Sequence, residues 1–300
     1  MQNYWWILAV GLSLLTSAYV YVNQFIKIKG SLLMVYRGLG TAAILLPFLF
    51  LFAPIHNWAF YGLCIAQGLV ISLGDNRILN GAKTFGAQVT SLIHPLSIAL
   101  IFLFWIMLHP ADFAAFIHHP LHLGLILACL LGTTIALILI CQARANRKAL
   151  SFLLVGMFCE IFIDVTNKET THLGAENLLS AIYYYTFITS LVAGSVNLFV
   201  HIRHGHKLPD FWAKKNLRVA WFFMLFAIIH GMLKTYTMYL TPNPAYVAAI
   251  VHAYPVWILL FNNIYYRFNH DNNCIKIKPQ LILLLLISIV GLIFLTGHAD

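Results

Sequence analysis

Long apolar stretches separated by short polar connections recur along the whole 300-residue chain. Each stretch holds roughly 20 residues, the length that an α-helix needs to cross the hydrocarbon core of a bilayer. The pattern predicts ten membrane-spanning helices, near residues 5–25, 32–53, 57–75, 85–108, 121–142, 151–171, 177–201, 218–240, 244–266 and 280–297. The connections between them are too short to hold a soluble domain, so the pattern predicts an all-α membrane protein.

Two of the apolar stretches share an unusual order of residues: small side chains, then a proline, then bulky apolar side chains. They are Gly81–Trp105 and Thr241–Tyr265, and their prolines, Pro95 and Pro255, are 160 positions apart. Broken helices at corresponding places in two halves of a chain indicate a substrate site between the halves. The alternative is two ordinary proline-containing membrane helices, since proline is tolerated there.

Other features recur at nearly the same offset. Short turns are expected near Asn80–Thr84 and Thr241–Pro244, just before the two proline-containing stretches. Five spans in each half is an odd number, so the second half enters the membrane from the opposite side. The sequence therefore predicts two inverted five-helix repeats, residues 1–145 and 146–300, within one integral membrane unit.

Composition excludes a water-soluble domain. Apolar residues make up 61% of the chain and charged residues 9%, and the mean hydropathy is +0.84. Soluble domains carry about 25% charged residues, so lipid is the expected solvent of this chain. The net charge of +9 does not indicate nucleic-acid binding, because the basic residues lie in short connections at the level of lipid headgroups.

Basic residues also predict the orientation. Sixteen of the 18 Lys and Arg residues lie in or beside the odd-numbered connections, and the other two are Lys168 and Lys234. The positive-inside rule then places both termini outside the cytoplasm. We expect a multi-pass protein of the bacterial inner membrane. The outward loop carries His109, His118, His119 and His122, which are either solvated or available for a metal or for pH sensing.

No sequence pattern for a cofactor, a metal or a catalytic group is present. The five cysteines are scattered and lack the spacing of a metal site. A phosphate-binding loop, a dinucleotide fingerprint and the spacing of a catalytic triad are also missing. The sequence therefore predicts no cofactor, no bound metal, no catalytic residue and no enzymatic activity.

Leu79–Leu100 and Leu233–Leu259 both show a helix end, a short turn, small residues and a proline. Together with Asn23–Lys29 and the following Tyr36-Arg37-Gly38, they resemble the ten-helix EamA-type branch of the drug/metabolite transporter superfamily. The resemblance implies ten helices, inverted repeats and the transport of small metabolites or drugs. The chain departs from the family pattern at Leu108-His109-Pro110, where members often have an acid. Its expected outside termini also differ from the cytoplasmic termini that are common in the family.

Two acids inside the sixth predicted span are the candidates for coupling transport to protons. Glu160 and Asp164 are four residues apart and so share one face of a helix. Glu160 lies roughly 13 Å from the start of the span at Ser151, since a helix rises about 1.5 Å per residue. A buried acid favours its neutral, protonated form, which suits a proton site. The pair could instead hold a cationic group of the substrate, or Asp164 could form a structural ion pair with Lys168.

His94 and Tyr254 precede the two repeated prolines and are the first candidates for substrate binding. A proline frees a carbonyl of the preceding turn, which can then face a cavity. Lys234, inside the eighth span, is expected to pair with one of the two acids or with a substrate carboxylate. Further candidates for substrate binding are Tyr246, Trp257 and Gln88, and His252 and His230 are weaker ones. For each of them, ordinary helix packing is the alternative.

These features favour a secondary active transporter that moves a small organic solute, such as an amino acid, an amine or a related metabolite. It would work by alternating access, driven by protons or by exchange. The expected partners are the substrate, the lipid bilayer and a second copy of the chain in a homodimer, and no nucleic acid. The alternatives are a membrane-embedded lipid-modifying enzyme and a scaffold that does not transport.

Overall fold

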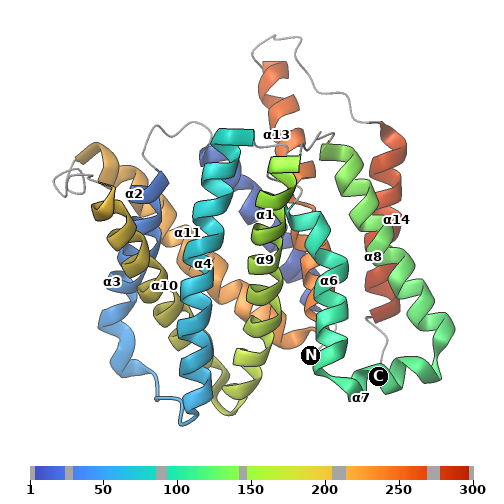
Figure 1. Ribbon diagram of the computed structural model, residues 1–300, viewed down its shortest axis with the longest axis horizontal. Helices are drawn as coiled ribbons and strands as arrows, with labels where there is room; N and C mark the ends of the chain where they lie inside the picture. The colour runs from blue at the N-terminus through green and yellow to red at the C-terminus, as the bar shows by residue number, and fades with distance from the viewer. Residues whose placement is uncertain are drawn as a thin grey trace. The chain divides into compact units, whose positions relative to one another are not determined.

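The computed structural model describes residues 4–23, 30–85, 93–141, 147–204, 214–268 and 278–296. Within these ranges the chain is helical almost throughout and contains no strand (Figure 1). The chain divides into two compact units. Unit 1 comprises Met1–Tyr21, Gly81–Val165 and Leu240–Asp300, and unit 2 comprises Val22–Asn80 and Thr166–Tyr239. Each unit thus combines segments from both halves of the chain.

In unit 1, α6 packs against both α8 and α12. Its elements are α1 (Trp5–Asn23), α6 (Ile93–Leu108), α7 (Pro110–His118), α8 (Pro120–Cys141), the first two thirds of α9 (Arg147–Leu173), α12 (Pro244–Val251), α13 (Tyr254–Phe268) and α14 (Pro279–Thr296). Every residue of α12 is buried. Alanines at positions 245, 248 and 249 let neighbouring helices approach it closely.

Unit 2 is built around the long helix α10, which packs against the segment Gly30–Leu45. Its elements are α2 (Gly30–Val35), η2 (Tyr36–Gly40), α3 (Thr41–Leu45), η3 (Leu46–Leu51), most of α4 (Trp58–Phe85), the end of α9, η4 (Ala175–Asn177), α10 (Leu178–Arg203) and α11 (Lys214–Leu240). Asn177 caps α10, since its side chain accepts a hydrogen bond from the backbone N–H of Ser180.

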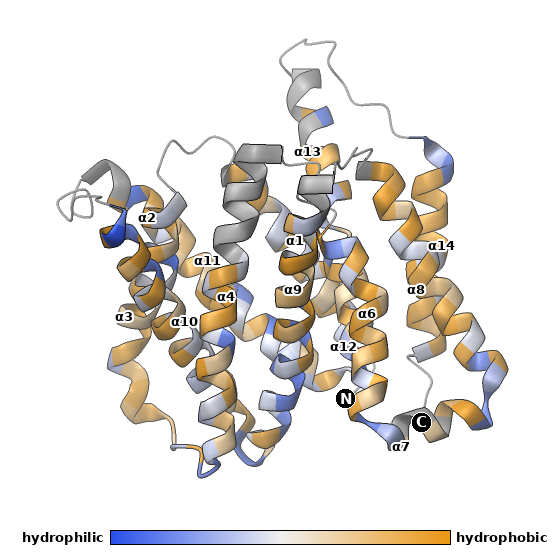
Figure 2. Ribbon diagram, viewed as in Figure 1, coloured by the Kyte–Doolittle hydropathy of each residue, from blue (hydrophilic) through white to orange (hydrophobic). Residues whose placement is uncertain are grey.

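Among the described residues, seven helical stretches are long and apolar enough, by length and composition, to cross a membrane. Their outer faces are apolar as well: on α14, Leu286, Val290 and Phe294 follow each other at intervals of one turn, and all three are more than half exposed. Figure 2 shows apolar residues along most of α6, α8 and α14. Soluble proteins rarely expose such continuous apolar faces, and the chain is accordingly an all-α membrane protein.

The two predicted turns have different outcomes. Thr241–Asn243 connects α11 to α12 as a short turn, which confirms the second one. Asn243 caps α12 and Pro244 occupies its first position, where a missing N–H costs no hydrogen bond. The first prediction is wrong, because α4 continues through Asn80–Thr84 to Phe85. Residues 76–85 include no proline, so nothing in the sequence requires the helix to end there.

In unit 1, α8 and α14 run side by side in opposite directions (Figure 1). Small residues let them approach: a Cβ placed on Gly132 would lie 2.4 Å from Ser288 Oγ. A Cβ on Gly291 would likewise lie 3.0 Å from Cys129 Sγ. The two contacts are reciprocal, because Cys129 and Gly132 on α8 correspond to Ser288 and Gly291 on α14.

We expect Gly132→Ala to lower the melting temperature of the purified protein, because the added methyl group would overlap the hydroxyl of Ser288. Because this hydroxyl can rotate away from the added carbon, we expect a cost at the lower end of the overpacking range, about 1 kcal/mol. Ser288→Ala in the same chain should restore stability, since the remaining Cβ of residue 288 would lie 3.5 Å away. Gly124→Ala on the same helix is the control, as nothing lies within 4 Å of its added carbon. A double variant as unstable as Gly132→Ala would contradict the packing described.

Candidate functional site

The ninth predicted span is broken in its middle. Helix α12 ends at Val251 and α13 begins at Tyr254, which leaves His252 and Ala253 in a turn between them. Pro255 is the second residue of α13 and lacks the N–H that would bond to the Val251 carbonyl in a continuous helix. Unit 1 therefore contains a discontinuous helix at the place where the sequence indicates one.

In the first proline-containing stretch, Gly81–Trp105, the proline lies in a similar position. Helix α6 begins at Ile93, so His94 and Pro95 lie in its first turn. The residues that directly precede α6, 86–92, lie outside the described part of the chain. Both repeated prolines thus lie in the first turn of a helix, and both of these helices belong to unit 1.

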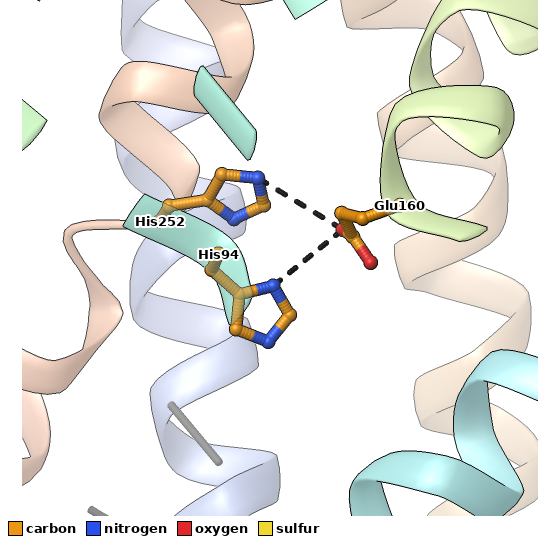
Figure 3. Close-up of side chains that lie close together, drawn as sticks. All are labelled: His94, Glu160 and His252. Atoms are coloured by element: carbon orange, nitrogen blue, oxygen red, sulfur yellow. Dashed lines mark ion pairs between the residues drawn. The ribbon is translucent and has the colours of Figure 1, made fainter. Parts of the chain in front are cut away.

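Two histidines beside these helix starts point toward one carboxylate (Figure 3). His94 Nδ1 lies 3.6 Å from Glu160 Oε1, and His252 Nε2 lies 3.9 Å from the same oxygen. The three side chains come from α6, from α9 and from the turn between α12 and α13. Their exposed fractions are only 12%, 14% and 4% for His94, Glu160 and His252. The fold therefore gathers three ionisable groups, from three separate segments, inside unit 1.

A second carboxylate adjoins this group. Asp164 Oδ2 lies 3.8 Å from His252 Nε2, and the Asp164 side chain is 1% exposed. Asp164 follows Glu160 by one turn of α9, so both carboxylates face His252. Glu160 is the central residue of α9, about 20 Å from either end at about 1.5 Å per residue. We refer to His94, Glu160, Asp164 and His252 as the His–carboxylate cluster.

Neighbouring side chains hold the cluster in place. The His94 ring lies 4.8 Å from the His252 ring and 5.4 Å, edge to face, from the Tyr254 ring. One turn before Glu160, Gly156 lets α9 approach the start of α6, since a Cβ there would lie 2.6 Å from Ile93 Cδ1. Glu160 therefore reaches the two imidazoles from a helix that packs directly against one of their segments.

The cluster is suited to binding a cation. Carboxylates attract positive charge, and uncharged imidazoles donate nitrogen lone pairs to protons or metals. Ionisable groups at the depth of a membrane are costly and mark substrate or ion pathways. The prediction that Glu160 and Asp164 couple transport to protons is not tested by this geometry and stays a prediction.

The other predicted substrate-binding residues are spread over the molecule. Tyr254 contacts His94 at the cluster, whereas Tyr246 is buried between Trp5 and Phe102, with ring centroids 6.3 Å from each. Trp257 is half-buried on α13. Lys234 is half-buried on α11, in unit 2. Gln88 lies outside the described residues.

Unit 2 has a polar centre of its own at the end of α9. Asn167 Nδ2 donates to the Tyr185 hydroxyl at 2.7 Å, which joins α9 to α10. Lys168 Nζ, almost fully buried, donates to the Met238 carbonyl at 3.1 Å, which joins α9 to α11. These bonds give Lys168 a structural role within unit 2. Buried polar groups that are hydrogen-bonded in this way fix the packing of the helices.

His252 is the site residue that the sequence ranked too low. Alignment on the two prolines places Tyr254, not His252, opposite His94. The chain leaves helical geometry at residues 252 and 253, so a one-to-one alignment fails over this turn. The signal that pointed to His252 was its place three residues before Pro255 in a predicted broken helix, since discontinuous helices form the substrate and ion sites of transporters.

Comparison with known proteins supports the fold and is silent on function. No protein-family model matches the chain, and no curated protein matches it in sequence. One solved protein, described only as a crystal structure of a protein, is similar over 100% of both chains with a TM-score of 0.68. Sequence identity to it is 14%, so the similarity shows a shared fold and nothing further.

Proposed function

We propose that this protein is a secondary transporter of small solutes that works by alternating access. The observation that carries the proposal is the His–carboxylate cluster beside a broken helix in a protein whose helices are otherwise strongly apolar. Carriers bind substrates and coupling ions near mid-membrane, at discontinuous helices. Glu160 lies at the middle of a helix of 27 residues, which fits that depth.

Helix pairs support the further proposal of ten spans in two inverted repeats. In the reciprocal contacts of α8 with α14, Gly132 meets Ser288 and Cys129 meets Gly291, so the corresponding positions, 129 with 288 and 132 with 291, are 159 residues apart in both cases. In unit 2, Gly38 meets Gly194, 156 positions later, at the crossing of η2 and α10. Reciprocal contacts between antiparallel elements are what a two-fold axis produces. Both offsets are close to the 160 positions between the repeated prolines.

The proposed solute is small and organic, and carries a positively charged group. An amine or amino acid has the ammonium group that Glu160 and Asp164 would attract. The resemblance to EamA-type transporters supports the same class of solute. In an alternating-access cycle, binding biases the equilibrium between two states only if the ligand binds them with different affinities. Carboxylates exposed to water in one state and enclosed in the other provide such a difference.

A reconstituted-protein assay tests the proposal. We expect a thermal-shift screen of amines and amino acids to find solutes that raise the melting temperature, because a ligand of the folded state stabilises it. Liposomes that contain the protein should then take up the labelled solute faster than protein-free liposomes. Protein-dependent conversion of lipids without solute uptake would contradict the proposal and favour a lipid-modifying enzyme. Binding of no solute and no uptake would favour a scaffold.

A further inference from the structure

We propose that His94, Glu160 and His252 form a binding site for one divalent ion of a first-row transition metal, such as Zn²⁺. Their ligand atoms, two imidazole nitrogens and one carboxylate oxygen, all lie within 4.8 Å of one another. The inference concerns what these side chains bind and does not depend on whether the chain transports solutes.

The spacing of the three ligand atoms suits a shared ion better than direct hydrogen bonds. The two imidazole–carboxylate distances, 3.6 and 3.9 Å, exceed the usual 2.7–3.2 Å of an N–H···O hydrogen bond. His94 Nδ1 is buried and makes no hydrogen bond to the described residues. Two ligands at about 2.0–2.2 Å from one zinc ion in tetrahedral geometry are about 3.3–3.6 Å apart. A shift of a few tenths of an ångström would bring both of these pairs to that distance, and the two imidazole nitrogens, which lie within 4.8 Å of each other, would have to approach further.

The types of donor atom select the class of metal. Imidazole nitrogen suits zinc, copper, iron and nickel, whereas Mg²⁺ and Ca²⁺ prefer sites built from oxygen alone. Soft ions such as Cu⁺ favour thiolate or thioether ligands, and the three proposed ligands include no sulfur. Three protein ligands are also the usual number at open zinc sites, where a water molecule completes the coordination.

Charge favours a dication in the same place. Asp164 Oδ2 lies 3.8 Å from His252 Nε2, so a second carboxylate stands next to the three ligands. Carboxylates attract positive charge, so Glu160 and Asp164 favour a cation at this place. Asp164 and His252 are only 1% and 4% exposed, so water and salt screen this attraction less than they would at a surface.

The site is built by the fold and not by one helix. Its ligands come from the first turn of α6, the centre of α9 and the turn after α12, three segments that are far apart in sequence. The two imidazole rings contact each other, and Tyr254 packs edge to face on His94. Ligands held by such contacts lose little conformational freedom on binding an ion, which raises affinity.

Calorimetric titration of the detergent-purified, metal-stripped protein with Zn²⁺ tests the proposal. We expect about one equivalent to bind, and we expect His252→Asn and Glu160→Gln each to weaken that binding at least about tenfold. The matched controls are His172→Asn and Glu176→Gln, which alter exposed residues at the far end of α9 and just beyond it. Co²⁺ provides a second readout, since bound imidazole changes its visible absorption.

Equal Zn²⁺ affinity in the wild type and in the two site variants would overturn the proposal. The same conclusion would follow if the two control variants lost as much affinity as the site variants. If His252→Asn fails to fold, His94→Asn takes its place, because His94 is the more exposed of the two histidines. Solute uptake by a protein that binds no Zn²⁺ would remove the metal site and leave the proposed transport intact. Specific Zn²⁺ binding without solute uptake would support the metal site and contradict the proposed transport.

Discussion

Glu160→Gln is expected to fold like the wild type and to lose at least about 30-fold in solute affinity and uptake. Both histidines of the His–carboxylate cluster point toward the Glu160 carboxylate. Glutamine keeps the shape of the side chain and removes its negative charge. Loss of one partner from a buried charge pair costs about 2–5 kcal/mol, and 2 kcal/mol corresponds to about 30-fold in affinity.

Two measurements separate this effect from a loss of structure. The melting temperature of the ligand-free variant should stay near that of the wild type, whereas the increase that the solute produces should vanish. Uptake into proteoliposomes should fall to the level of protein-free liposomes. Glu176→Gln, at an exposed position after α9, should retain full uptake. Wild-type uptake by Glu160→Gln would exclude the cluster as the transport site.

The second large effect is expected from Gly38→Ala, which should prevent or strongly weaken the packing of η2 against α10. A Cβ at Gly38 would lie 2.3 Å from Gly194 Cα and 2.8 Å from the Ser190 carbonyl oxygen. Both are backbone atoms, which cannot move aside by rotating a side chain. We therefore expect a loss of stability at or above the upper end of the usual overpacking range, about 3 kcal/mol.

Gly62→Ala on α4 is the matched control for this substitution. It lies in the same unit, and nothing lies within 4 Å of the carbon that it adds. Alanine in a helix is more favourable than glycine by roughly 0.5–1 kcal/mol, so this variant should melt at or slightly above the wild-type temperature. The melting temperatures of the two variants are compared in the same detergent. Similar melting temperatures for the two would show that η2 and α10 are not in close contact.

The pattern of apolar stretches correctly predicted the class of the protein and most of its helices. Helices such as α8 and α14 begin and end within about two residues of the expected limits. Such agreement is expected, because a backbone in lipid must satisfy its own hydrogen bonds and a helix does so locally. The interruption before Pro255 was also predicted, since proline removes a backbone donor regardless of its surroundings.

The sequence was a poorer guide to the structure in two places. Asn80–Thr84 was expected to form a turn and instead continues α4, because polar and small residues do not by themselves end a helix. Tyr246 stays a predicted substrate-binding residue, and its ring neighbours in the structure, Trp5 and Phe102, were not predicted. Partners of a buried aromatic ring come from other helices, and their approach cannot be read from local spacing.

By itself, then, the sequence determined an apolar, all-helical chain, a broken ninth helix and a pair of acids on one helix face. These properties depend on composition, on proline and on helical periodicity, all of which act over a few residues. Only the tertiary structure decided that His94 and His252 meet Glu160, with Asp164 beside them. Their positions in sequence, 94, 160 and 252, have no spacing that predicts contact, because the packing of α6, α9 and α12 brings them together.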